Sequence, residues 1–76
     1  MRNIIENIIK DEFFKNHFDI VQTDSRIIVI ASGCTIGYIW VYRNVIRYNF
    51  RGYNDENHID IGDLDIKQLI QAFAER

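Results

Sequence analysis

Residues 36–51 read IGYIWVYRNVIRYNFR, two runs of alternating side-chain type that meet at Arg43-Asn44. β-Branched and aromatic residues dominate both runs, which is typical of strands. A two-residue turn at Arg43-Asn44 joins such runs as a β-hairpin with a fixed register. One side of this hairpin then carries three cross-strand pairs: Tyr42 with Val45, Trp40 with Arg47, and Tyr38 with Asn49. The other side carries Ile39, Val41, Ile46, Tyr48 and Phe50.

Two further runs before the hairpin have the same β character. Residues 18–23 and 26–31 are rich in β-branched residues and flank a tight turn at Asp24-Ser25. Residues 32–35 form a second turn that leads into the hairpin. A short run at 58–61 is compatible with an additional, fifth strand. The pattern therefore predicts four antiparallel strands in sequence order, with the fifth as an option.

Helical patterns stand at both ends of the chain. Residues 3–17 combine a capping-box spacing of Asn3 and Glu6 with a broad apolar stripe, which predicts a deeply buried helix. That stripe consists of Ile4, Ile5, Ile8, Ile9, Phe13 and Phe14. Near the C-terminus, Asp63 or Asp65 is expected to cap a second helix. The apolar positions of this second helix recur at helical spacing: Leu64, Ile66, Leu69, Ile70 and Phe73.

The order α-β-β-β-β-α predicts one α+β domain over residues 1–76. We expect a four-stranded antiparallel meander sheet with an N-terminal and a C-terminal helix. With 76 residues the chain has room for one modest hydrophobic core. Its composition, 47% hydrophobic and 13% aromatic, places it in the globular class.

Both faces of this sheet are apolar when the register is followed through the turns. One face collects Phe18, Ile20, Ile27, Val29, Ala31, Ile36, Tyr38, Trp40, Tyr42 and Val45. The other collects Val21, Ile28, Ile30, Ile39, Val41, Ile46, Tyr48 and Phe50. Two helices, each about 10 Å wide, cover roughly one face of four strands spaced about 4.8 Å apart. One apolar face is therefore left over.

We expect a second copy of the chain or a target protein to bury the face with Tyr38, Trp40 and Tyr42, because large exposed apolar patches mark interfaces. The alternative is that one helix covers each face and only a small patch stays exposed.

Charge is distributed unevenly, although the net formal charge is only −2. Arg43, Arg47 and Arg51 lie in a stretch without acids, and an acidic run follows from Asp55 to Asp65. A chain that is acidic overall lacks the basic field of a dedicated nucleic-acid-binding protein.

The acidic run has two interpretations. Its carboxylates mimic a phosphate backbone and contact a basic target, or they form a solvated loop and an ordinary acidic helix start. The run does not match a calcium-binding loop, because the final bidentate Glu is missing and Gly62 is misplaced.

The pair of Trp40 and Arg47 also has two interpretations. With Arg51 further along the same face, the pair is able to stack a nucleic-acid base and hold a phosphate. The simpler interpretation is a cross-strand cation–π pair that stabilises the sheet.

Candidate catalytic residues are few. The single cysteine, Cys34, rules out an internal disulfide and fits a reducing compartment. Nothing in the sequence places His17 or His58 beside it, so no nucleophile and base are predicted. We expect no enzymatic activity, no cofactor and no metal. Glu6 and Lys10 interrupt the N-terminal isoleucines, so neither a signal peptide nor a membrane span is predicted, and we expect a complete, cytoplasmic protein.

The order of helices and strands is similar to that of the double-stranded-RNA-binding domain and of the HicA-like toxins built on it. Asp63-Leu64-Asp65 stands where the RNA-binding family has a lysine cluster, and the Gly-Ser-His strand of the toxins is absent. The whole chain also resembles small phage-encoded inhibitors, including anti-CRISPR proteins, in being short, proline-free, mildly acidic, rich in Ile and Asn, and without a catalytic motif. This resemblance implies that the chain binds a host enzyme and blocks it without a cofactor.

These observations predict a non-enzymatic protein-binding module of inhibitor or adaptor type that forms a dimer. The expected partner is a host enzyme or nucleoprotein complex, or a second copy. The aromatic sheet face is expected to contribute Tyr38, Trp40, Tyr42, Arg47 and Arg51, and the acidic loop Asp55, Glu56 and Asp60. The alternative function is a small nucleic-acid-binding protein that uses Tyr38, Trp40, Arg47 and Arg51.

Overall fold

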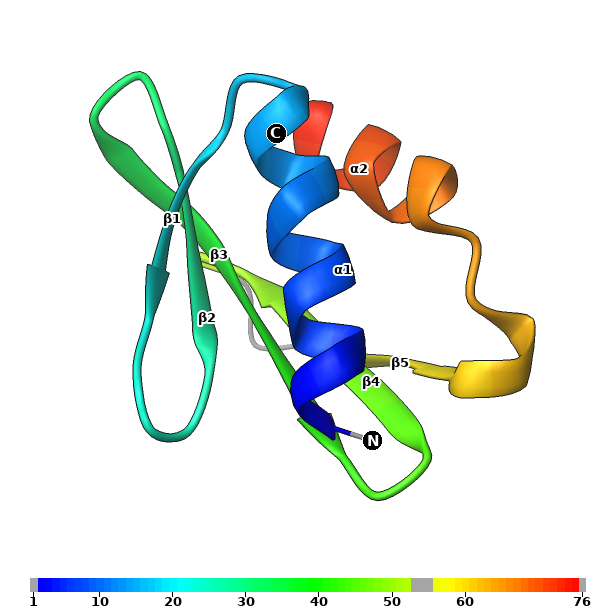
Figure 1. Ribbon diagram of the computed structural model, residues 1–76. Coiled ribbons are helices and arrows are strands. Elements are labelled where there is room, and N and C mark those ends of the chain that lie inside the picture. Colours follow the sequence, from blue (N-terminus) through cyan, green and yellow to red (C-terminus); the bar gives the residue numbers. More distant parts are fainter. Residues whose placement is uncertain (1, 53–55, 76) are drawn as a thin grey trace.

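The structure is a computed structural model that describes residues 2–52 and 56–75 (Figure 1). Its elements follow one another as α1 (Arg2–Lys15), β1 (Asp19–Gln22), β2 (Ile27–Ala31), β3 (Cys34–Tyr42), β4 (Val45–Phe50), β5 (Asn57–Asp60), the 3₁₀ turn η1 (Ile61–Asp63) and α2 (Ile66–Ala74). The predicted α+β class with a helix at each end is confirmed.

The strands form one antiparallel sheet in the order β1-β2-β3-β4-β5, so every strand lies beside its neighbour in the sequence. The predicted meander is confirmed, but the predicted number of four strands was wrong because β5 adds a fifth at the edge. Polar residues surround Ile59 in β5, so the strand propensity of this segment is weak. Ile59 of β5 pairs with Ile46 of β4. These two residues are distant in the sequence, so the pattern of residues around Ile59 does not reveal the pairing.

The hairpin of β3 and β4 has the predicted register. Tyr42 pairs with Val45, Trp40 with Arg47 and Tyr38 with Asn49. Arg43 takes a φ of 57°, a left-handed conformation that the tight turn between the strands uses.

A β-bulge between β2 and β3 interrupts the alternation that the sequence suggested. Val29 pairs with Gly37, but the next residue, Ile30, pairs with Thr35, so Ile36 is an extra residue in β3. A shift of one residue exchanges the two faces of a strand. As a result, the residues of β1 and β2 that were predicted to share a side with Tyr38 lie on the opposite side of the sheet.

Ile27 and Val29 consequently lie on the same side as Ile39 and Val41, and not with Tyr38 as predicted. This assignment was wrong because the alternation was followed through the turn as if the register were unbroken. The sheet residues of the buried core are Ile27, Val29, Ile39, Val41, Ile46 and Phe50.

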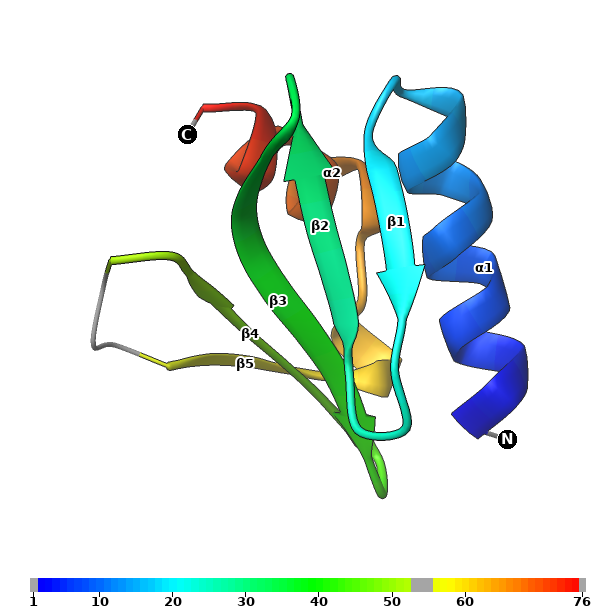
Figure 2. The same ribbon diagram turned by 90° about the vertical axis from the view of Figure 1, so that its left-hand side faces the viewer.

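Both helices pack against this one face of the sheet, as Figure 2 shows with α2 behind the strands and α1 beside β1. The core contains Ile9 and Phe13 of α1 together with Leu69, Ile70 and Phe73 of α2. The expectation that the helices cover one face and leave the other is confirmed for the described residues.

Close packing of α2 on the sheet depends on Gly37. A Cβ atom at this position would lie 2.5 Å from the Asn49 carbonyl oxygen and 2.5 Å from the Phe73 ring. The Phe73 ring centroid in turn lies 4.9 Å from that of Phe50 and 5.4 Å from that of Phe13. This aromatic cluster joins both helices to the sheet.

The outer side of α1 remains exposed, contrary to the predicted deep burial. Its large apolar side chains there are Ile4, Ile8 and Phe14, with exposed fractions of 62%, 43% and 72%. Only the apolar residues on the inner side of α1 contact the sheet, because one side of a helix packs against the layer beside it.

The helix ends are set by local hydrogen bonds. At the end of α1, His17 has a φ of 71°, and the Phe18 N–H donates to the Phe13 carbonyl at 3.1 Å, as in a Schellman motif. The Asp65 side chain caps α2 by accepting from the N–H groups of Lys67 and Gln68. α1 begins before Asn3, so the predicted capping box was wrong. In the described ranges, no helix is both long enough and apolar enough to cross a membrane.

Candidate functional site

The side of the sheet that points away from both helices, here called the open face, carries the predicted aromatic residues. Tyr38, Trp40 and Tyr42 occupy alternate positions of β3, the central strand. Tyr42 is 57% exposed, and Tyr38 and Trp40 are half-buried. Within residues 2–52 and 56–75, no helix lies over them (Figure 2). The cross-strand pairs add Asp19, Val21, Ile28, Ile30, Thr35, Val45, Arg47, Asn49, His58 and Asp60 to the open face.

Two arginines lie against rings of this aromatic row. The Arg26 guanidinium carbon is 4.0 Å from the Tyr38 ring centroid, and that of Arg43 is 5.3 Å from the Tyr42 centroid. A hollow of about 230 Å³ lies beside them, lined by Ser25, Arg26 and Trp40. Cation–π contacts of this kind hold the rings in place and keep positive charge beside the aromatic row, with Arg43 at the end of β3.

Arg47 has a different partner from the one expected. It lies opposite Trp40 in the register, but its guanidinium forms an ion pair and hydrogen bond with Glu56. Both side chains are partly exposed, at 41% and 43%. The pair joins two residues that were predicted to serve separate surfaces, so the aromatic row and the start of the acidic run form one continuous region.

The remaining predicted site residues lie at the margins of that region. Asp60, in β5, is exposed and shares the open face with Val45, its partner in β4. Arg51 follows β4, is exposed, and donates its backbone N–H to the Ile36 carbonyl at 3.0 Å. Asp55 lies outside the described residues. Arg51 is therefore at the end of the sheet opposite to Asp60.

Sequence reasoning assigned the wrong residues of β1 and β2 to this surface. Val21, Ile28 and Ile30 were expected on the other face, and Arg26 was not considered as a site residue. The bulge at Ile36 brings all of them to the open face. The glycine inside the strand, Gly37, was the signal that pointed to an irregular position next to it.

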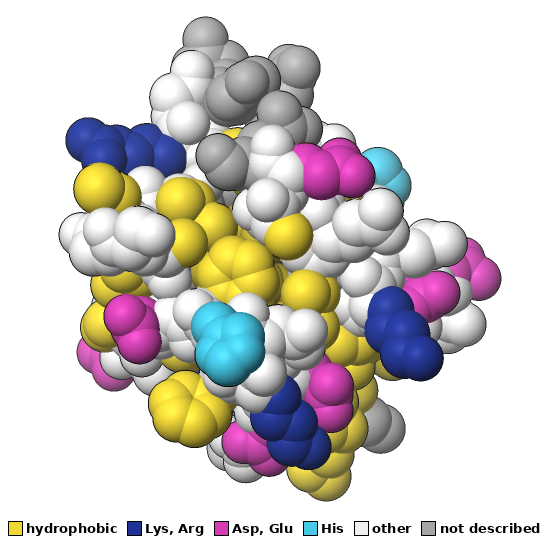
Figure 3. All heavy atoms as spheres, turned by 90° about the horizontal axis from the view of Figure 1, so that it is seen from above, with side chains coloured by type: hydrophobic (Ala, Val, Ile, Leu, Met, Phe, Trp, Pro, Cys, Tyr) yellow, Lys and Arg dark blue, Asp and Glu magenta, His cyan; other side chains and the backbone are white. Residues whose placement is uncertain are grey.

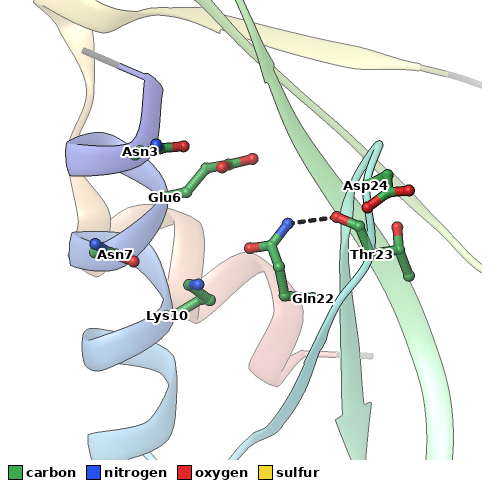
Figure 4. Close-up of a pocket in the computed structure, with 7 residues that line it drawn as sticks. All are labelled: Asn3, Glu6, Asn7, Lys10, Gln22, Thr23 and Asp24. Carbon is green, nitrogen blue, oxygen red and sulfur yellow. Dashed lines mark hydrogen bonds between the residues drawn. The ribbon is translucent and has the colours of Figure 1, made fainter.

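A polar hollow of about 430 Å³ lies between α1 and the turn that joins β1 to β2 (Figure 4). Figure 4 shows the Glu6 carboxylate directed from α1 across this space, and Glu6 is only 5% exposed. On the other side, Gln22 donates from Nε2 to the Thr23 carbonyl at 2.8 Å. The full lining is Asn3, Glu6, Asn7, Lys10, Gln22, Thr23 and Asp24. The Gln22 and Thr23 side chains form hydrogen bonds within the turn, and the lining contains no Cys, Ser or His.

Apolar surface also occurs at the end of the molecule where α1 and α2 terminate. Figure 3 looks down on this end and shows hydrophobic side chains gathered in its centre, with charged groups around them. Phe14, in the last turn of α1, is exposed by 72%. The exposed large apolar side chains of the described residues are thus divided between α1, with Ile4, Ile8 and Phe14, and the open face, with Val21 and Tyr42.

The candidate catalytic residues lie in separate elements. Cys34 is exposed at the start of β3, His17 follows α1, and His58 is in β5. Among the residues that the structure describes, no group of three His, Cys, Asp or Glu side chains is placed to hold a metal ion.

Comparisons of the chain with known protein families, with curated proteins and with solved structures found no match. The geometry of the open face is therefore the basis for assigning a function.

Proposed function

We propose that this chain is a non-enzymatic protein-binding module that docks on a target protein through the open face. The observation that carries the proposal is the row of Tyr38, Trp40 and Tyr42 on the central strand, with both helices on the opposite side. Aromatic side chains and arginines are the residue types that supply most of the energy in protein interfaces. The row of Tyr38, Trp40 and Tyr42, together with Arg26 and Arg43, brings aromatic residues and arginines together on one surface.

The margin of the open face sets the orientation of the target. Asp60, the last residue of β5, carries an exposed negative charge, and Glu56, just before β5, is paired with Arg47. Arg26 and Arg43 keep positive charge over the tyrosine rings. A target with a basic strip beside an apolar patch fits this arrangement, because complementary charge at the rim fixes register and raises the association rate. Such binding inhibits a host enzyme when the bound patch of the enzyme overlaps the active site of that enzyme. Phage inhibitors act in this way.

Nucleic-acid binding is the second candidate, since Arg26 and Arg43 accompany aromatic rings that stack bases. Two observations favour the protein target. Arg47 is already paired with Glu56, so a phosphate has to displace a carboxylate. The net charge of −2 also repels a polyanion.

The test is capture of the target from a host lysate on the tagged full chain, compared with two variants. Trp40→Ala removes the centre of the open face, and Phe14→Ala removes an exposed aromatic side chain of similar size from α1. We expect one protein to be retained by the wild type and by Phe14→Ala and to be lost with Trp40→Ala, and the activity of that protein to fall when the wild type is added. Equal capture by all three chains contradicts the proposal. Oligonucleotide binding that weakens steeply with salt and is lost in Arg26→Ala supports the nucleic-acid alternative instead.

A further inference from the structure

A small hollow lies beside the indole ring on the open face, and it is called the Trp40 hollow below. Its volume is about 230 Å³, and its walls are formed by Ser25, Arg26 and Trp40. Arg26 directly precedes β2, whose first residue pairs with Ile39, so the antiparallel register places Arg26 next to Trp40. The turn before β2 and the central strand β3 therefore build the Trp40 hollow together.

One hydroxyl group holds the turn that forms a wall of the hollow. Thr23 Oγ1 accepts hydrogen bonds from the N–H groups of Ser25 at 3.4 Å and of Arg26 at 3.1 Å. The Thr23 N–H also donates to the Arg26 carbonyl at 2.9 Å. Because these bonds fix the backbone of the turn before any ligand arrives, they lower the entropy cost of binding in the hollow.

The side chains of the Trp40 hollow offer hydrogen-bond donors and one positive charge. A guanidinium and an indole carry N–H donors and no acceptor, so only the Ser25 hydroxyl is able to accept a hydrogen bond. Within residues 2–52 and 56–75, the Arg26 guanidinium forms neither an ion pair nor a hydrogen bond. Its carbon lies 4.0 Å from the Tyr38 ring centroid. The hollow thus fits an anion that accepts hydrogen bonds.

The other arginines near the aromatic row do not supply this charge. Arg47 lies on the other side of Trp40, but its guanidinium is paired with Glu56. Arg43 follows the end of β3 and does not line the hollow. Among the arginines of the described residues, Arg26 is therefore the one that is open to an anion beside the indole.

The volume of the hollow limits the size of that anion. Pockets for whole small-molecule ligands measure about 300–1,000 Å³, so 230 Å³ is enough for one side chain but not for a nucleotide. The two oxygens of a carboxylate match the fork of a guanidinium, and the methylene groups behind them pack against an indole ring. The net charge of −2 repels a chain of phosphates more strongly than it repels one carboxylate.

We propose that the Trp40 hollow is the anchor site for one acidic side chain, an Asp or a Glu, of the target protein. This proposal rests on the proposed function, since it names the chemical group by which the target engages the open face. Arginine and tryptophan are the residue types at which binding energy is concentrated in interfaces. The target then presents a carboxylate next to its apolar patch, in addition to the basic strip that faces Asp60.

The test follows the isotope-labelled full chain by NMR while a probe with a single carboxylate, N-acetylglutamate amide, is added at constant ionic strength. Trp40 is the single tryptophan, so its indole N–H gives one signal, and the Arg26 Nε–H signal is assigned from its loss in Arg26→Gln. We expect both signals to shift saturably, with a dissociation constant on the order of 10 mM. N-acetylglutamine amide has the same shape without the charge and should cause no saturable shift.

Two arginine variants locate the site. Arg26→Gln should abolish the saturable shift of the Trp40 signal, whereas Arg43→Gln, which removes a guanidinium outside the hollow, should leave it unchanged. Both side chains are exposed, so the fold is retained. With the captured target, Arg26→Gln should raise the dissociation constant about tenfold.

Three results overturn the proposal: equal shifts with the neutral probe, an unchanged response in Arg26→Gln, or inorganic phosphate that binds in the hollow when the glutamate probe does not. The last result supports the nucleic-acid alternative. If Trp40→Ala loses the target but Arg26→Gln binds it as tightly as the wild type, the proposal fails and the proposed function stands. If the glutamate probe binds but no captured protein depends on Trp40, the proposed function fails and the carboxylate preference of the hollow stands.

Discussion

Neighbouring residues of β3 have separate roles because they lie on opposite faces of the sheet. Ile39 is fully buried in the core, while Trp40 is half-buried on the open face. The helices pack against Ile39 and leave Trp40 without a helical cover. The proposed function therefore assigns stability and binding to two adjacent positions.

This separation predicts different costs for truncating the two side chains. Ile39→Ala leaves a cavity in the core and should lower the free energy of unfolding by about 2–5 kcal/mol. Trp40→Ala should lower it by only about 1 kcal/mol, because no packed core surrounds the indole. Urea denaturation followed by circular dichroism measures both values. An equal loss in the two variants shows that Trp40 belongs to the core.

Gly37 provides a second prediction at this scale. Gly37→Ala forces a Cβ against the Asn49 carbonyl and the Phe73 ring, so it should destabilise the fold by about 1–3 kcal/mol. Gly62→Ala is the control, because a Cβ there has no atom within 4 Å. Thermal unfolding of both variants distinguishes them. A Gly37→Ala variant as stable as the control means that α2 does not sit closely on β3.

The elements show which parts of the fold the sequence is able to predict. The β3–β4 hairpin was predicted with its register, since each partner lies within a few residues of the turn. The bulge at Ile36 was not predicted, and β5 was predicted only as an option, because both depend on pairing with a separate segment. The link between Arg47 and Glu56 was missed for the same reason, as it joins residues 9 positions apart through β5. The sequence thus predicted which residues of the hairpin share the open face, but not which residues of β1 and β2 lie there with Arg26.

The start of α2 gives a prediction that separates two candidate caps. The Asp65 side chain accepts from two backbone N–H groups, whereas Asp63 belongs to the preceding 3₁₀ turn. Asp65→Ala should lower the free energy of unfolding by about 1 kcal/mol, and Asp63→Ala should change it little. Chemical denaturation of the two variants provides the comparison. A larger loss for Asp63→Ala contradicts this assignment of the cap.

At the scale of the whole molecule, one layer of two helices covers one face of a five-stranded sheet. The core unites α1, α2 and the covered face, and the aromatic row lies outside it. A chain of 76 residues thereby leaves one face of its sheet, with the row of Tyr38, Trp40 and Tyr42, without a helical cover in the described residues. The proposed function requires that a partner reaches this surface.

Trp40 is the single tryptophan of the chain, so its fluorescence reports on the open face without a label. The most direct measurement is acrylamide quenching of this fluorescence in dilute protein, before and after adding the captured target. We predict efficient quenching in the dilute chain, and a blue-shifted, protected emission in the complex. A complex that forms while Trp40 stays as accessible as before, or an indole already protected in the dilute monomer, would contradict the assignment of the open face as the docking surface.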